Sequence, residues 1–146
     1  MVKVSKSKFK KDKLYPRVTA AVHKILESSR VVTPVDVMME IGFLRKDRFE
    51  DWRFGRVPYL ERVMTCNLSK AQRVLMILKY HAGERGLRQS STTYKKWGKG
   101  RKHLLQFSKS GSPSMETLYA THYVAGEGKK RAPEEVVPKN GERSAK

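Results

Sequence analysis

The side chains best suited to chemistry lie in one basic stretch, TTYKKWGKGRKHLLQF, from Thr92 to Phe107. It holds five Lys and Arg residues and no Asp or Glu, and acids are absent from the whole run Arg85–Met115, which carries eight Lys and Arg. An ordinary solvated surface mixes charges of both signs, because like charges repel. Unopposed cations can each neutralise a phosphate and release its counterion. The stretch therefore indicates a polyanionic partner.

Catalytic patterns are weak by comparison. The histidines are His23, His81, His103 and His122, and no HxxxH or HxH spacing brings two of them together. His103 and His122 could act as general acid and base of a nuclease with Lys102 holding a phosphate, but no local pattern requires it. The sequence also lacks a Gly-rich phosphate loop leading into a helix and a nucleophile elbow. We expect a protein that is not an enzyme, with a nuclease-type activity as the residual alternative.

Acidic side chains form one cluster in the middle of the chain, Asp47, Glu50 and Asp51. A carboxylate metal site is conceivable there, but the neighbouring cations suggest ion pairs instead: Arg45, Lys46, Arg48 and Arg53. The single cysteine, Cys66, permits neither an internal disulfide nor a cysteine-based zinc site. The sequence thus predicts no metal and no other cofactor.

The net charge points the same way as the basic stretch. Thirty-two Lys and Arg against 14 Asp and Glu give +18, and the pI is about 10.2. A pI above about 9 with clustered basic residues is typical of nucleic-acid-binding proteins. No run approaches the roughly 18 apolar residues of a membrane span, and the basic N-terminus is not followed by an apolar signal region. We expect nucleic acid, DNA or RNA, as the partner, no membrane, and a reducing cytoplasmic location.

The two ends of the chain differ from its middle. Hydrophobic residues make up 38% of the sequence, below the roughly 45–50% of an average globular chain. Residues 1–13, with six Lys and one Asp, and residues 125–146 show no sustained apolar periodicity. We therefore predict a disordered basic arm over 1–13, a single globular domain over 14–124, and a disordered C-terminal tail over 125–146.

The domain is predicted to be α+β and mainly helical, because apolar residues recur at helical spacing through most of it. Helices are expected over about 16–29, 34–42, 45–54, 58–66, 70–86 and 113–124, with Thr33, Ser69 and Ser112 as N-caps. Gly42 and Gly86 are natural helix stops. Two strands, 91–97 and 101–108, would form one basic β-hairpin around the Gly98–Gly100 loop.

The segment 59–78 is similar to the DNA-binding helix-turn-helix motif. Asn67 tolerates the left-handed backbone of a tight turn, Leu68 follows as the turn hydrophobe, and Ser69 can cap the second helix. Arg73 departs from the pattern, because an apolar residue ordinarily packs inward there. A plain αα-hairpin is the alternative. Helices followed by a hairpin with a basic tip also resemble the winged-helix arrangement, as an analogy of architecture.

A three-residue hairpin loop would set Trp97 opposite Arg101 and Lys95 opposite His103. Alternation then gives one face that packs on the helices, with Trp97, His103, Leu105 and Phe107, and one that points outward, with Tyr94, Lys96 and Lys102.

These patterns together predict non-catalytic nucleic-acid binding through a basic helix and a hairpin, with duplex DNA ahead of RNA. The expected phosphate contacts are Lys70, Arg73, Arg85, Arg88, Lys95, Lys96, Lys99, Arg101 and Lys102. The alternatives are an RNA- or ribosome-associated accessory protein, or a module that binds an acidic protein. The chain could also form homo-oligomers.

Overall fold

The computed structural model describes residues 4–126 and confirms an α+β fold with a large helical share. The α-helices in the described residues are α1 (Tyr15–Leu26), α2 (Pro34–Ile41), α3 (Lys46–Arg53), α4 (Leu68–Glu84) and α5 (Pro113–Ala120). Two short 3-10 helices, η1 (Phe9–Lys11) and η2 (Leu60–Val63), precede α1 and α4. The strands are β1 (Val31–Val32), β2 (Arg88–Ser91) and β3 (Thr121–Val124).

The three strands form an antiparallel sheet in the order β1-β3-β2. In the register, Val31 is opposite Val124 on one side of β3, and Arg88 is opposite the same Val124 on the other. The predicted helix over 113–124 is therefore too long, since α5 ends at Ala120 and continues directly as β3. β-Branched and aromatic residues suit this central strand, which finds backbone partners on both sides.

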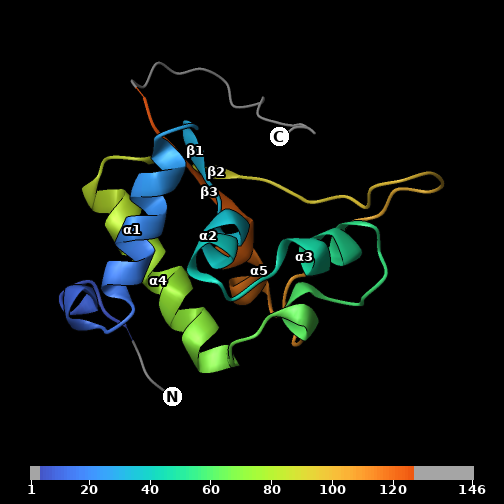
Figure 1. The fold of residues 1–146 in the computed structure, drawn as a ribbon, viewed down its shortest axis with the longest axis horizontal. Coiled ribbons are helices and arrows are strands. Elements are labelled where there is room, and N and C mark those ends of the chain that lie inside the picture. The colour runs from blue at the N-terminus through green and yellow to red at the C-terminus, as the bar shows by residue number, and fades with distance from the viewer. Residues whose placement is uncertain (1–3, 127–146) are drawn as a thin grey trace.

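The helices pack around this small sheet, with α1 against α4 and α2 (Figure 1). The core is rich in aromatic residues, and Trp52, Tyr119 and Tyr123 are among its largest fully buried side chains. The ring of Phe107 stacks on Tyr119 with centroids 5.3 Å apart. No helix in the described part of the chain has the length and hydropathy needed to cross a membrane.

Several helix ends follow local sequence signals. The Thr33 hydroxyl accepts a hydrogen bond from the Asp36 amide at 2.9 Å, which confirms it as the N-cap of α2. Gly42 ends the same helix with φ of 99°, a left-handed conformation that glycine adopts without steric cost. Ser112 accepts a hydrogen bond from the Met115 amide and caps α5 as predicted.

The predicted helix-turn-helix does not form between residues 59 and 78. The segment before α4 is the four-residue 3-10 helix η2, where the motif requires an α-helix. Asn67 has φ of −82° and ψ of 172°, so the turn lacks the expected left-handed residue. Asn67 is itself the N-cap of α4, because its side chain accepts the Lys70 amide at 2.8 Å. Ser69, the predicted cap, lies inside the helix.

The predicted disordered arm over 1–13 is wrong for most of its length. Phe9, in η1, is only 2% exposed, and Asp12 binds Arg73 of α4. One buried aromatic ring and one half-buried ion pair hold a lysine-rich segment that composition alone assigns to disorder. At the other end, the Ala125 amide donates to the Arg30 carbonyl at 2.7 Å. The rest of the predicted tail, from residue 127, and residues 1–3 lie outside the described residues.

The capping assignment of α4 can be tested by two alanine substitutions. We expect Asn67→Ala to lower the free energy of unfolding by about 1 kcal/mol, because the Lys70 amide loses its acceptor. Ser69→Ala should change it by less than about 0.5 kcal/mol, as is usual for positions without such a role. Urea unfolding followed by circular dichroism measures both. A larger loss for Ser69→Ala than for Asn67→Ala would contradict the assignment.

Candidate nucleic-acid interface

The basic stretch forms a long, narrow hairpin that projects from the body of the protein (Figure 1). Its two arms are extended and are joined by one isolated bridge, between Lys95 and Leu104. The Lys96 amide donates to the His103 carbonyl at 3.0 Å, and the Leu105 amide donates to the Tyr94 carbonyl at 2.8 Å. The predicted reversal of the chain at Gly98–Gly100 is therefore present, but the predicted strands 91–97 and 101–108 are wrong, since the arms share one isolated bridge and form no regular strand.

The hairpin register differs by one residue from the prediction. Lys95 is opposite Leu104, where a three-residue loop would set it opposite His103. A shift of one residue exchanges the two faces of a strand. Here the first arm turns over relative to the second, so that Tyr94, predicted to point outward, is buried and only 9% exposed. The second arm keeps its predicted sides, with Phe107 buried and Leu105 half-buried, but His103, predicted to pack inward, is exposed near the tip. Gly98 and Gly100 have φ of 95° and 93°, so this tip conformation suits glycine and an added side chain would strain both positions.

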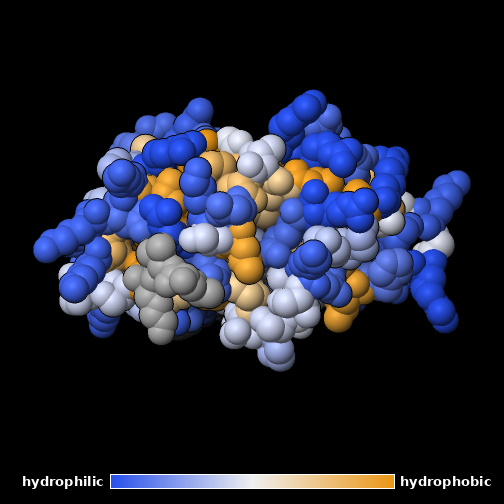
Figure 2. Space-filling view, turned by 90° about the horizontal axis from the view of Figure 1, so that it is seen from below, coloured by the Kyte–Doolittle hydropathy of each residue, from blue (hydrophilic) through white to orange (hydrophobic). Residues whose placement is uncertain are grey.

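Five cations stand on the hairpin without an acidic partner. Lys95, Lys99, Arg101 and Lys102 are exposed, and Lys96 is half-buried. Among residues 4–126, none of the five forms an ion pair with Asp or Glu. Lys102 instead donates to the Gly98 carbonyl across the tip. Figure 2 shows hydrophilic side chains spreading from the end of the molecule where the tip lies in Figure 1.

The remaining predicted contacts are not part of this group. Lys70 and Arg85 are both exposed but lie at opposite ends of α4, about 22 Å apart at 1.5 Å of helix rise per residue. Arg88 is exposed at the start of β2, seven residues before Lys95. Arg73 is unavailable, because its guanidinium binds both carboxylate oxygens of Asp12, at 2.9 and 2.7 Å.

Arg53, which the sequence assigned to ion pairing, anchors the hairpin. Its guanidinium lies over the rings of Tyr94 and Trp97, with 4.9 and 4.5 Å from Cζ to the two centroids. Its Nη2 donates to the Lys95 carbonyl at 3.1 Å, and its own carbonyl accepts the Trp97 amide at 2.7 Å. Burial lowers the pKa of Arg53 to about 10, so the group stays charged at neutral pH. Its buried Nε has no hydrogen-bond partner.

Aromatic packing supports the same anchor. The Trp97 ring meets Phe49 and Phe54 edge-on, with centroids 5.8 and 5.5 Å apart. Gly98 lies against Phe54, so that a Cβ added there would meet the ring at 3.4 Å. The first arm is therefore packed against the end of α3 up to the tip.

The second arm is fixed at its base by backbone hydrogen bonds. The Trp52 indole donates to the Gln106 carbonyl at 2.8 Å. The Glu116 carboxylate accepts the amides of Phe107 and Ser108 at 3.1 and 2.7 Å, and Glu61 accepts the Lys109 amide at 2.9 Å. These two acids are thus occupied below the hairpin and leave the tip positive.

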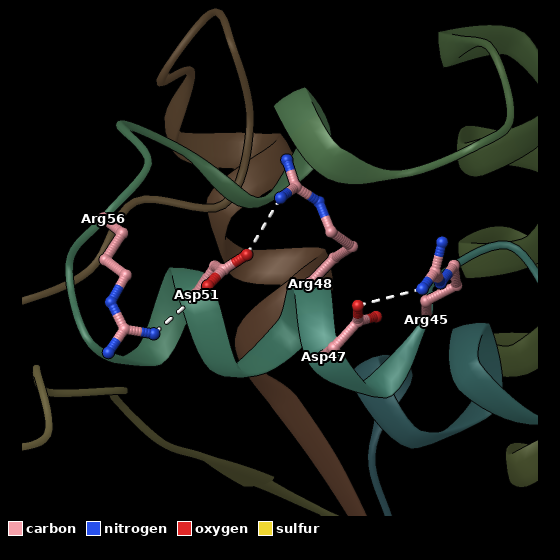
Figure 3. Close-up of polar contacts among 5 residues, drawn as sticks. All are labelled: Arg45, Asp47, Arg48, Asp51 and Arg56. Atoms are coloured by element: carbon pink, nitrogen blue, oxygen red, sulfur yellow. Dashed lines mark hydrogen bonds and ion pairs between the residues drawn. The ribbon is translucent and has the colours of Figure 1, made fainter.

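Two acids of the cluster on α3, Asp47 and Asp51, form ion pairs with neighbouring arginines, which confirms that part of the prediction (Figure 3). Asp47 binds Arg45 at 2.9 Å, and Asp51 binds Arg48 and Arg56 at 2.9 and 3.1 Å. These carboxylates are therefore paired with arginines other than those of the hairpin. Within residues 4–126, no three His, Cys, Asp or Glu side chains converge as a metal site would require.

The two histidines considered for catalysis lie in separate environments. The His103 side chain is exposed, whereas His122 on β3 hydrogen-bonds the buried Tyr94 hydroxyl at 3.0 Å. Cys66 lines a pocket of about 280 Å³ together with Glu61 and Lys109. Burial raises the pKa of the Cys66 thiol and so reduces its nucleophilic thiolate fraction at neutral pH.

Comparison with known proteins adds no relative: no family model, no curated protein and no solved structure matches this chain.

The anchoring role of Arg53 predicts the effect of a substitution that keeps the charge. Arg53→Lys loses the planar contact with both rings and the geometry of the Lys95 hydrogen bond. We expect a loss of about 1 kcal/mol or more in the free energy of unfolding. Hydrogen exchange should also show at least about fivefold lower protection of the Lys96 and Leu105 amides, because a loss of about 1 kcal/mol changes the opening equilibrium by about that factor.

Arg45→Lys is the matched control, because Arg45 is exposed and pairs only with Asp47 in the described part of the chain. It should alter stability by less than about 0.5 kcal/mol. Equal effects of the two substitutions, or unchanged protection in Arg53→Lys, would show that the hairpin does not depend on Arg53.

Proposed function

We propose that this protein is a non-catalytic nucleic-acid-binding protein that contacts phosphates through its hairpin. The single observation that carries the proposal is the group of five cations on a projecting, anchored hairpin, none paired with an acid within residues 4–126. Concentrating like charges on an extended element is unfavourable in isolation, and a polyanion relieves that repulsion. The contacts we assign are Lys95, Lys96, Lys99, Arg101 and Lys102.

The shape of the hairpin favours duplex DNA as the ligand. The major groove of B-form DNA is about 12 Å wide and admits a two-stranded ribbon. The major groove of A-form RNA is deep and narrow, so the same ribbon would have to lie across its outer surface. The hairpin alone can fit this groove, without a recognition helix. On α4, Lys70 and Arg85 can add phosphate contacts only beyond the hairpin, and Arg73 stays with Asp12.

Arg101 is the one arginine among the five hairpin cations. A lysine acts as a point charge toward phosphate, whereas an arginine can also bind two acceptors at once. Four lysines and one arginine favour binding that depends mainly on charge, with little reading of base sequence. The expected signature is an affinity that falls steeply with salt, with a slope of about −0.9 for each phosphate neutralised on duplex DNA.

The proposal is tested by the triple variant Lys99→Ala, Arg101→Ala, Lys102→Ala. Fluorescence anisotropy with a duplex DNA of mixed sequence should show at least about tenfold weaker binding at low salt. The slope of log K against log salt should become shallower by about 3, one unit for each phosphate contact removed. The loss should be similar for duplexes of different sequence, because phosphate contacts carry no base information.

The matched control removes one arginine and two lysines elsewhere, in the variant Lys46→Ala, Arg62→Ala, Lys79→Ala. These residues are exposed and lack an ion pair among residues 4–126. Each of the two variants removes three positive charges, so the net charge changes equally in both. Equal losses in the two variants would defeat the assignment of the hairpin. Tighter binding of duplex RNA or rRNA fragments than of DNA would favour an RNA-associated role, and no binding to any nucleic acid would favour an acidic protein partner.

A further inference from the structure

A buried histidine, His81, lies near the segment Ser5–Lys13, called here the N-terminal segment. His81 lies near the end of α4 and is only 9% exposed. Neither of its ring nitrogens has a hydrogen-bond partner. A buried polar group without a partner is costly and rare. Burial of the neutral ring without hydrogen bonds is already unfavourable, and burial of the protonated ring would be far more unfavourable.

The N-terminal segment is held against α1 and α4 by three contacts. Phe9 is buried and packs on Tyr15 of α1 and Tyr80 of α4, with ring centroids 5.7 and 5.5 Å apart. Lys10 pairs with Glu84 at 3.1 Å. Asp12 binds Arg73 through two hydrogen bonds. The segment therefore covers α4 along the side that carries Arg73, Tyr80 and Glu84.

His81 belongs to the same contact region. Its ring meets the ring of Tyr15 edge-on, with centroids 6.1 Å apart, and Tyr15 is also the residue on which Phe9 packs. The charged groups that act on His81 are Glu84 and Arg85 from α4 and Lys10 from η1, while α1 presents the phenol of Tyr15. Two of these three charges are positive. Burial and the net positive charge of its surroundings therefore both disfavour protonation of His81.

We propose that His81 is a pH-sensitive latch whose protonation releases the N-terminal segment from α1 and α4. Departure of the segment removes the positive charge of Lys10 and the Phe9 ring that packs on Tyr15 beside the imidazole, so the released form accepts the proton more easily. Release also separates Asp12 from Arg73. The acid form would then expose Arg73 and the lysines of the segment, Lys6, Lys8, Lys10, Lys11 and Lys13. The latch is independent of the hairpin and of the proposed function.

The direction of the pH effect follows from the environment of His81. Burial lowers its pKa, Arg85 and Lys10 act in the same direction, and Glu84 opposes them. The released ring should titrate near its ordinary value of about 6.5. The segment is therefore fully docked above that pH, and its docking constant falls by up to about tenfold for each pH unit below it, until the lower pKa of the docked state is reached.

Hydrogen exchange of the full-length chain between about pH 5 and pH 7.5 tests the latch, since a histidine titrates in this window. The reporters are the amides of Lys11, Asp12 and Tyr15, which donate to Lys8, Phe9 and Asp12 carbonyls. After correction for intrinsic exchange, their protection should fall below about pH 6.5 by up to about tenfold per pH unit. Protection of the Ile77 and Leu78 amides inside α4 should fall less, because the helix remains folded. Reporter protection that does not change with pH would overturn the proposal.

Substitutions assign the effect to His81. In His81→Leu, which stays apolar and does not titrate, reporter protection should be independent of pH over this range. His23→Leu is the control, since His23 is exposed on α1 and its removal should preserve the pH dependence. Arg73 lowers the pKa of Asp12, so this ion pair stays charged throughout the window and does not contribute to the pH dependence of the reporter protection. The same pH dependence in His81→Leu as in the natural chain would overturn the latch.

A direct titration keeps the proposal testable if His81→Leu fails to fold. The imidazole carbon resonances of His81 in the natural chain, followed by NMR, should shift with a midpoint below about 6.5. A midpoint at or above that value would show that docking does not oppose protonation, and the proposal would be wrong.

Discussion

The position of the hairpin depends on the contact of Arg53 with Tyr94 and Trp97. A projecting pair of arms with one bridge between them has little stability of its own, because isolated two-stranded ribbons are marginal in water. Arg53 adds stability that the few hydrogen bonds between the arms do not provide. It stacks on two rings of the first arm and exchanges hydrogen bonds with the backbone of that arm. The same guanidinium stays charged at neutral pH and lies against the first arm of a hairpin that carries five further cations. Anchor and electrostatic role thus come from one side chain.

The distribution of acids explains why the hairpin remains positive. Asp47 and Asp51 are paired with arginines of the α3 region, and Glu61 and Glu116 accept backbone amides at the base of the second arm. None of these four carboxylates is left to approach the tip. Exposed ion pairs contribute only about 0–1 kcal/mol each, so their value here lies less in stability than in leaving the cations of one element unopposed.

Local signals predicted the elements whose ends are set by neighbouring residues. Thr33 and Ser112 cap their helices as expected, and Gly42 ends α2 in a left-handed conformation, because a cap involves only residues three or four positions apart. The basic hairpin was also visible in the sequence, since its composition and its glycines lie in one stretch. The three-stranded sheet was not, because β1, β2 and β3 are short and their partners are far apart in the chain.

Other errors arose where two patterns were equally compatible with the sequence. A loop of three residues and a loop of four both fit Gly98–Gly100, and the choice between them decided that Tyr94 shares a face with Leu105 and is buried. Asn67 and Ser69 are both good caps, and the structure shows that the extended backbone and the Lys70 hydrogen bond belong to Asn67. The lysine-rich N-terminal segment was assigned to disorder because composition does not show that its one phenylalanine is buried against the rings of Tyr15 and Tyr80.

The sequence by itself determined the charge, the helical periodicity and the location of the basic stretch, since each depends on residue type and on near neighbours. Tertiary structure decided which cations are free. Arg73 and Lys99 look alike in the sequence, but Asp12 reaches Arg73 across 61 positions of chain and no acid among residues 4–126 pairs with Lys99. Charge is a property of a residue, whereas its neutralisation depends on the distance to another residue, which only the folded chain sets.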